Sequence, residues 1–305
     1  MDFRNLGIGI ILLLENTIGL LGNVSLLSYY LFIYYKKHKV KPMDLISIHL
    51  IMVNFLIILS KGMGHTMTTF GLKYFFNDWS YQLFMYVQRV FRSMSIATLS
   101  LLSVFSVIII IPGNSCWKKL KAKTPKDIGI YISICWILYI MVNILFPLYM
   151  STQLRRKNRT KETGFERYTV AGHDKITVSL YIVLSVFPEL LFSVLITWSN
   201  ILMIVFLYRH KEKVHNIRST CVFHSNSPES RATQNIFFRM FIFLAIYTLS
   251  TISHGCSALL SVQNWFLMYI TIITTLSFPT LSPFVLMSQS SPLSILCFHW
   301  IKDTE

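Results

Sequence analysis

The chain has 305 residues, of which 53% are hydrophobic and only 13% are charged. Soluble domains carry about 25% charged residues, so this composition excludes a soluble enzyme or another water-exposed globule. The net charge of +15 would suit a nucleic-acid partner. However, the basic residues lie in short clusters between long apolar runs and form no continuous binding face, which excludes nucleic acid. The composition therefore predicts a polytopic protein whose surroundings are the lipid bilayer.

Seven apolar runs are long enough to cross the hydrocarbon core as helices, which takes roughly 20 residues each. In chain order they cover residues 6–33, 43–61, 82–111, 128–150, 178–207, 237–260 and 266–287. The alternating ten-residue segments of a transmembrane β-barrel are absent from the sequence. We therefore expect an all-α membrane protein that forms one seven-helix bundle, followed by a short cytoplasmic tail over residues 288–305.

The basic residues predict how this bundle is oriented in the membrane. Fifteen lysines and arginines lie in the tail and the connections after the first, third and fifth runs, against nine on the opposite side. Positive charge is retained in the cytoplasm, which places the N-terminus outside. The triplet that begins at Asn158 is an N-glycosylation acceptor, and it falls on the side that the charges assign to the exterior.

Ionisable side chains inside a bilayer are costly and call for a partner or a function. Arg89 and Arg92 are three residues apart in the third run and share a helix face, and Glu189 lies at a similar depth in the fifth run. We expect Arg92 and Glu189 to face a common cavity in the outer half of the bundle. There they either pair with each other or bind a polar ligand group. Tyr247 and His254 are candidates for the same cavity, with plain packing as the alternative.

Other unusual residues in the runs have simpler explanations. Lys61 and Arg239 fall at the ends of their runs, so we expect them to reach the membrane surface as anchors. Pro188 is expected to kink the fifth helix, and Pro279 and Pro283 are expected to kink the seventh.

The five cysteines predict neither a disulfide nor a metal site. Cys116, Cys221 and Cys297 fall on the reducing cytoplasmic side, and Cys135 and Cys256 lie within the fourth and sixth runs. No Cys/His spacing is typical of a metal centre, and we expect no cofactor. Cys297 is either an idle thiol or a site of palmitoylation.

The sequence offers no support for catalysis. It contains no nucleophile elbow, metal-binding HExxH helix or phosphate-binding loop, so we expect no enzyme. The seventh run has no lysine that could carry retinal. A transporter usually shows paired broken helices in two related halves, which seven unrelated runs do not provide. A small-solute transporter remains the alternative from a different class.

Several segments resemble vomeronasal type-1 receptors of mammals, a family of G-protein-coupled receptors. The resemblance runs from the first helix to the tail, and its most specific segments are LLSVF at 101–105, PGNSCWKKLK at 112–121, PKDIG at 125–129, YRHK at 208–211, SPESRATQ at 227–234 and FPTLSPFVLM at 278–287. It implies a pheromone receptor in the plasma membrane of vomeronasal sensory neurons. Such a receptor binds a small pheromone or odorant and activates a Gi/Go-type G protein. Bitter taste receptors have a similar layout and are the nearer alternative.

The same resemblance assigns roles to single positions. Arg89 and Arg92 match two arginines of the family's third helix, Glu189 stands where the family has an aspartate, and Asn158 matches its glycosylated loop. The family's extracellular cysteine pair is expected at Tyr81 and near Thr169, and this chain has a cysteine at neither position.

Activation is expected to proceed by population shift, in which the ligand prefers a state with separated inner ends of the fifth and sixth helices. The basic residues expected to face the G protein are Lys118, Lys119, Arg209, Lys211 and Lys213. The alternative for these residues is that they only set the topology.

Overall fold

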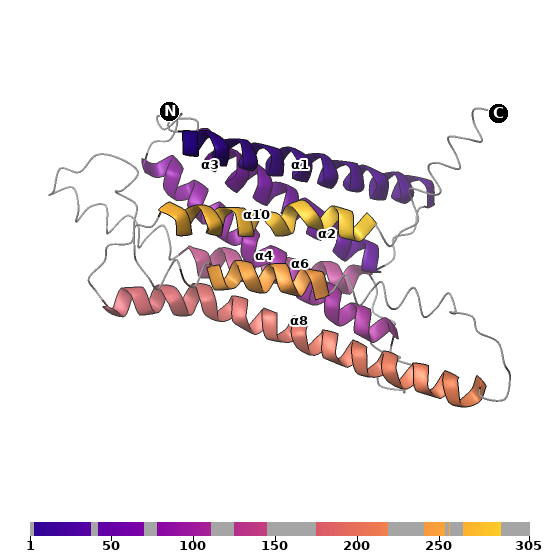
Figure 1. The fold of residues 1–305 in the computed structure, drawn as a ribbon. Coiled ribbons are helices and arrows are strands. Elements are labelled where there is room, and N and C mark those ends of the chain that lie inside the picture. Colours follow the sequence, from indigo (N-terminus) through magenta and orange to yellow (C-terminus); the bar gives the residue numbers. More distant parts are fainter. Residues whose placement is uncertain are drawn as a thin grey trace, which may run out of the picture.

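The computed structural model describes residues 3–37, 42–69, 78–110, 125–144, 175–218, 241–253, 256 and 265–287, and all of these are helical except Ile144 in a turn. The helices are α1 (Phe3–Lys37), α2 (Pro42–Ile57), η1 (Ile58–Gly62), α3 (Met63–Thr69), α4 (Asp78–Ile110), α6 (Pro125–Asn143), α8 (Lys175–Arg218), the Phe241–Ser253 helix and α10 (Trp265–Met287). η1 is a single π-helical turn, and it joins α2 to α3 without a break. The described chain therefore crosses the bundle seven times (Figure 1).

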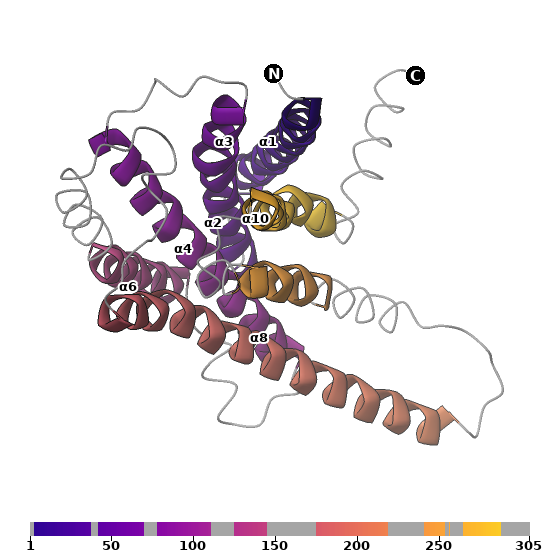
Figure 2. The same ribbon diagram turned by 60° about the vertical axis from the view of Figure 1, so that its left-hand side comes forward.

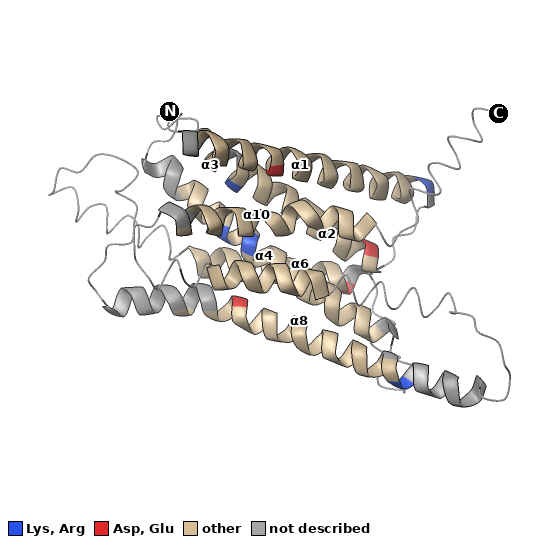
Figure 3. Cartoon of the chain, in the orientation of Figure 1, with Lys and Arg blue, Asp and Glu red and all other residues tan. Residues whose placement is uncertain are grey.

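The predicted seven-helix, all-α architecture is confirmed over these residues. Five helices are both long and apolar enough to span a membrane, and the shorter apolar helices Asp127–Asn143 and Phe241–Ser253 complete the set. Successive helices run in opposite directions, so the start of α1 and the end of α10 lie at opposite ends of the bundle (Figure 1). In the described residues, charged side chains interrupt the helices only at isolated points (Figure 3).

α4 is the central helix of the bundle. It contacts α2, η1, α6 and α8, and it crosses between the side formed by α1, α2 and α10 and the side formed by α6 and α8 (Figure 2). Of the membrane-spanning part of α4, 72% is buried inside the bundle. Of the membrane-spanning part of α8, only 22% is buried. Side chains that project from α4 therefore reach the interior of the bundle. They pack in a core that includes Leu50, Leu99, Ile196, Phe243 and Phe278.

The outer helices carry apolar side chains on their exposed faces. Leu21 of α1, Ile137 of α6 and Val194 of α8 are all more than 60% exposed. A soluble protein would rarely expose so continuous an apolar surface, but a bundle surrounded by lipid requires it.

A backbone carbonyl that a proline leaves without a donor in α10 is bonded from α1. Pro283 has no N–H to donate to the carbonyl of Pro279, its partner one turn earlier in a regular helix. Asn23 of α1 supplies the missing donor, and its Nδ2 lies 2.9 Å from that carbonyl oxygen. In a membrane such a replacement is needed because water cannot reach the freed group.

Three of the predicted helix ends are wrong. The second span continues past residue 61 to Thr69. α6 ends at Asn143 instead of residue 150. Pro147 follows closely in the sequence, and a proline disfavours helical conformation in the residue before it. α8 continues past residue 207 to Arg218. The added residues are mostly polar, so a criterion based on apolar character could not include them.

Candidate functional site

Arg92 of α4 and Glu189 of α8 form an ion pair inside the bundle. Arg92 Nε donates to Glu189 Oε1 at 2.8 Å, and Nη2 donates to Oε2 at 3.0 Å. The two side chains are only 11% and 12% exposed. This bidentate geometry is the strongest arrangement that a guanidinium and a carboxylate can adopt. Of the two alternatives in the sequence, pairing with each other is the one observed.

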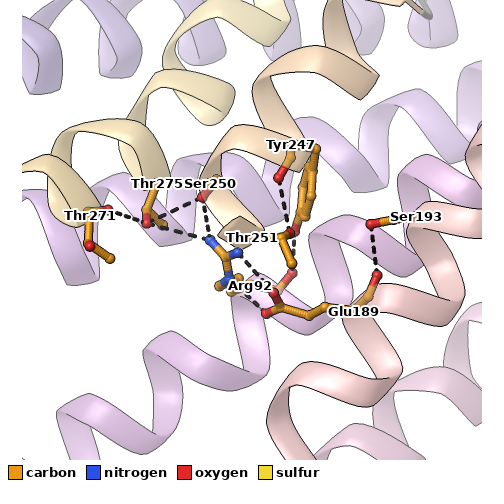
Figure 4. A network of polar contacts seen from close by, with 8 residues as sticks. All are labelled: Arg92, Glu189, Ser193, Tyr247, Ser250, Thr251, Thr271 and Thr275. Atoms are coloured by element: carbon orange, nitrogen blue, oxygen red, sulfur yellow. Dashed lines mark hydrogen bonds and ion pairs between the residues drawn. The ribbon is translucent and has the colours of Figure 1, made fainter. Parts of the chain in front are cut away.

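Three further residues connect this pair to the other side of the bundle, and we call the whole set the polar centre: Arg92, Glu189, Tyr247, Ser250 and Thr275. Arg92 Nη1 donates to Ser250 Oγ at 2.8 Å and to Thr275 Oγ1 at 3.5 Å. Tyr247 donates from its hydroxyl to the backbone carbonyl of Arg92 at 3.1 Å. Its ring centroid also lies 5.6 Å from Arg92 Cζ, within range of a cation–π contact. The polar centre therefore joins α4, α8, the Phe241–Ser253 helix and α10 (Figure 4).

The energetics of such a centre are asymmetric. Moving two charges out of water is expensive, and their attraction offsets this only when the remaining donors and acceptors are satisfied. Here Glu189 uses both carboxylate oxygens on Arg92, and the remaining Nη1 of Arg92 has two hydroxyl acceptors. Loss of one charge would leave the other buried and unpaired. A single substitution of Arg92 or Glu189 should therefore strongly destabilise the folded receptor.

The other predicted ligand-binding candidates differ in where they lie. Tyr247 belongs to the polar centre, and Arg89 lies one turn nearer the outer end of α4, partly buried on the face of Arg92. His254 is outside the described residues.

The expectation for Lys61 is wrong. Lys61 does not end its helix, because the chain continues through η1 and α3 to Thr69, about 12 Å farther at about 1.5 Å per residue. Its side chain is 8% exposed and interacts electrostatically with Arg92 and Glu189. The segment after Lys61 contains Gly62, Gly64 and several polar residues. These residues concealed the continuation of the helix.

Sequence reasoning missed Ser250 and Thr275. Both are buried hydroxyl residues in apolar helices, a type that is common in membrane spans for other reasons. Ser250 lies three residues after Tyr247 and therefore shares its helix face. That spacing was the one available signal.

A second polar set, which we call the amide set, lies deeper in the bundle and carries no charge. Asn54 of α2 donates from Nδ2 to Ser282 Oγ of α10 at 2.7 Å, and it accepts at Oδ1 from Ser95 Oγ of α4 at 2.9 Å. Asn23 of α1 completes the set through its bond to the Pro279 carbonyl. The two asparagines and two serines are at most 1% exposed. None of these four residues is among the positions predicted from the sequence.

A third contact between helices involves His49 of α2. Trp136 of α6 donates from Nε1 to His49 Nε2 at 2.9 Å, so the histidine proton lies on Nδ1. His49 Nδ1 is then the donor to Thr98 Oγ1 of α4 at 3.1 Å. The two bonds hold α2, α4 and α6 together.

The remaining predicted positions lie near the ends of the helices. Arg209 is exposed on the extension of α8, and Lys211 and Lys213 lie farther along the same helix. Asn158, Lys118 and Lys119 are outside the described residues.

The described residues contain no group of three His, Cys, Asp or Glu side chains that could hold a metal ion. Cys135 and Cys256 are partly buried free thiols in the described part of the chain. The other three cysteines lie outside it.

Comparison with known proteins identifies the family. The model of the vomeronasal organ pheromone receptor family matches residues 6–299. Human vomeronasal type-1 receptor 4 is 39% identical over 300 residues, which cover 98% of this chain and 99% of the relative. Human vomeronasal type-1 receptor 2 is 38% identical over 93% of this chain and 72% of its own length. Mouse vomeronasal type-1 receptor 45 is 28% identical over 90% of this chain and 86% of its own.

These relatives are receptors rather than enzymes, and they set aside the transporter and bitter-taste alternatives. The matches span nearly the whole chain, and the structure has the helices of a multi-pass membrane protein. The chain belongs to the vomeronasal organ pheromone receptor family, and its architecture is that of a G-protein-coupled receptor.

Proposed function

We propose that this receptor binds a small pheromone or odorant in the outer half of the bundle and activates a Gi/Go-type G protein. In this proposal the whole chain forms a single receptor domain in the plasma membrane of vomeronasal sensory neurons. Asn158 lies in a glycosylated outer loop. The family assignment supports the receptor class, and the polar centre supports the place of the ligand.

The observation that carries the proposal is the link that Arg92 makes among four helices. Arg92 contacts Glu189 on α8, Ser250 on the Phe241–Ser253 helix and Thr275 on α10. A ligand that bonds to any of these partners changes the contacts of Arg92 with the others. Such a ligand would have different affinities for bundles that differ in helix spacing, which is the requirement for a population shift. Arg89 and His254 are further candidates for ligand contact at the outer side.

The inner end of α8 is the proposed side of G-protein contact. Arg209 is exposed there, and the helix continues past Lys211 and Lys213 to Arg218. Lys118 and Lys119 are proposed to face the same side. Positive charge at this end would attract an acidic surface and increase the association rate.

The signalling part of the proposal is tested in cells that express the receptor with a Gi-family reporter. We expect a panel of volatile and steroid-like compounds to contain agonists whose response is abolished by pertussis toxin. Ion flux or solute uptake that does not depend on G protein, without any toxin-sensitive response, would contradict the proposal.

The ligand site is tested with two matched serine variants. Ser250→Ala removes a hydroxyl that bonds to Arg92, and we expect it to raise the half-maximal agonist concentration about fivefold to tenfold. Ser193→Ala is the control, because the Ser193 hydroxyl donates only to the backbone carbonyl of Glu189 in its own helix. Responses are compared at equal surface expression. If Ser250→Ala and the native receptor have the same half-maximal agonist concentration, the result would argue against ligand binding at the polar centre.

A further inference from the structure

Lys61 is a buried basic side chain for which the described part of the fold supplies no counterion. It lies in η1 and is 8% exposed, and its ammonium has no hydrogen bond or salt bridge to a side chain or carbonyl that the structure describes. Its electrostatic neighbours include Arg92, Glu189 and His65. An unpaired charge at this depth is among the most costly features that a membrane protein can contain.

Glu189 does not neutralise Lys61. Both of its carboxylate oxygens accept hydrogen bonds from Arg92, whose own positive charge repels Lys61. The other carboxylate at a comparable depth, Glu15 of α1, has Ser277 of α10 as its partner and is not among the charges that act on Lys61. Arg92 and Glu189 therefore balance each other, and neither carboxylate is left to balance the ammonium of Lys61.

The backbone holds Lys61 in this position. Asn16 of α1 packs so closely on η1 that a Cβ atom on Gly62 would clash with Asn16 Oδ1. Asn16 Nδ2 also donates to Thr66 Oγ1 at 2.8 Å, one turn beyond the glycine. Because α1 occupies this side of the turn, η1 cannot rotate to release Lys61 toward the lipid. π-helical turns are often found at functional sites.

We propose that Lys61 is the anion-binding residue of this receptor and that its ligand carries a carboxylate or an equivalent negative group. The proposal deepens the proposed function and rests on it, because it names the ligand chemistry of the same outer site. The ammonium is a compact charge with three donors, and it suits a carboxylate that arrives from outside. A cluster of buried apolar side chains includes Ile57, four residues before Lys61, together with Val90 and Met94 of α4. This cluster suits an apolar remainder of the ligand.

The experiment uses the purified full-length receptor in lipid nanodiscs and records thermal unfolding. The probes are hexanoate, octanoate, decanoate and phenylacetate at neutral pH, each compared with its methyl ester, which has a similar shape but no charge. The variants are Lys61→Gln and Lys61→Arg, with Lys36→Gln as a matched control because Lys36 is exposed at the far end of α1. A ligand that binds the folded state raises the Tm in proportion to the logarithm of its concentration.

We expect at least one acid to stabilise the native receptor at a concentration about tenfold to a hundredfold below that of its ester. Lys61→Gln should abolish this preference and still fold, because the substitution removes a charge that has no partner among the described residues. Lys61→Arg and Lys36→Gln should retain it. If no acid acts better than its ester, or if the preference persists in Lys61→Gln, the proposal is overturned.

The assay separates this proposal from the proposed function. Stabilisation by acids without any G-protein response would uphold anion binding and contradict the signalling role. A toxin-sensitive response to neutral odorants, with no preference for acids in the binding assay, would uphold the signalling role and contradict anion binding at Lys61.

Discussion

The polar centre and the amide set fulfil similar geometric tasks with different chemistry. Each joins helices that are distant in the sequence: the polar centre joins α4, α8, the Phe241–Ser253 helix and α10, and the amide set joins α1, α2, α4 and α10. The polar centre depends on a buried ion pair, whereas the amide set uses only neutral amides and hydroxyls. α4 and α10 take part in both.

The difference suggests a division of roles within one bundle. Neutral hydrogen bonds between membrane helices contribute modestly and do not depend on a matched charge. A buried ion pair gives little net stability, yet it penalises any state in which one partner is lost. The amide set is therefore suited to holding helices together, and the polar centre is suited to responding when a charged or polar ligand arrives.

The largest expected effect comes from removing one charge of the polar centre. Glu189→Gln leaves Arg92 buried without a counterion and should reduce the free energy of unfolding by about 3–5 kcal/mol. Thermal unfolding in nanodiscs measures the loss. The control is the double variant Arg92→Gln with Glu189→Gln, which removes both charges and should recover most of the stability. Equal stability of the single and double variants would show that the pair is not coupled.

An intermediate effect, of opposite sign, is expected at Asn200 on the inner half of α8. Asn200 is 5% exposed, and neither Oδ1 nor Nδ2 has a hydrogen-bond partner among the residues that the structure describes. Asn200→Leu removes two unsatisfied polar groups and keeps the branching of the side chain, so it should raise the free energy of unfolding by about 1–2 kcal/mol. Asn54→Leu is the matched control, and it should lower the Tm because Asn54 has partners on α4 and α10. A lower Tm for Asn200→Leu would show that Asn200 is bonded in the membrane.

The smallest effect is expected for one bond of the amide set. A double-mutant cycle with Asn54→Ala and Ser282→Ala should give a coupling energy of about 0.6 kcal/mol, the average for such bonds between membrane helices. The measurement is again thermal unfolding, for the native receptor, both single variants and the double variant. A coupling energy as large as that of Arg92 with Glu189 would remove the contrast between the two sets.

The sequence was sufficient for the parts of the molecule that follow from composition and depth. The number of helices follows from apolar length, and the meeting of Arg92 with Glu189 follows from opposite charges at matching depths in two spans. Neither inference needed knowledge of side-chain packing. Both depend on the cost of placing polar groups in lipid.

The sequence was insufficient where the outcome depends on local backbone geometry or on hydroxyl groups. The π-helical turn at Ile58–Gly62 has no periodic signature, so nothing indicated that Lys61 turns inward. Ser250 and Thr275 resemble many other hydroxyl residues in membrane helices, and only the crossing of their helices with α4 makes them partners of Arg92. The bond from Asn23 to Pro279 joins two ends of the chain that no local pattern connects.

The length of α8 has a mechanical consequence. The helix runs unbroken from Lys175 to Arg218, with Pro188 close to Glu189 and the other end well beyond the apolar span. From Pro188 to Arg218 it measures about 45 Å at about 1.5 Å per residue, so a tilt of about 10° at the proline would move the far end by about 8 Å. α8 can thus act as a lever that converts a small rearrangement around one carboxylate into a displacement large enough for a cytoplasmic protein to detect.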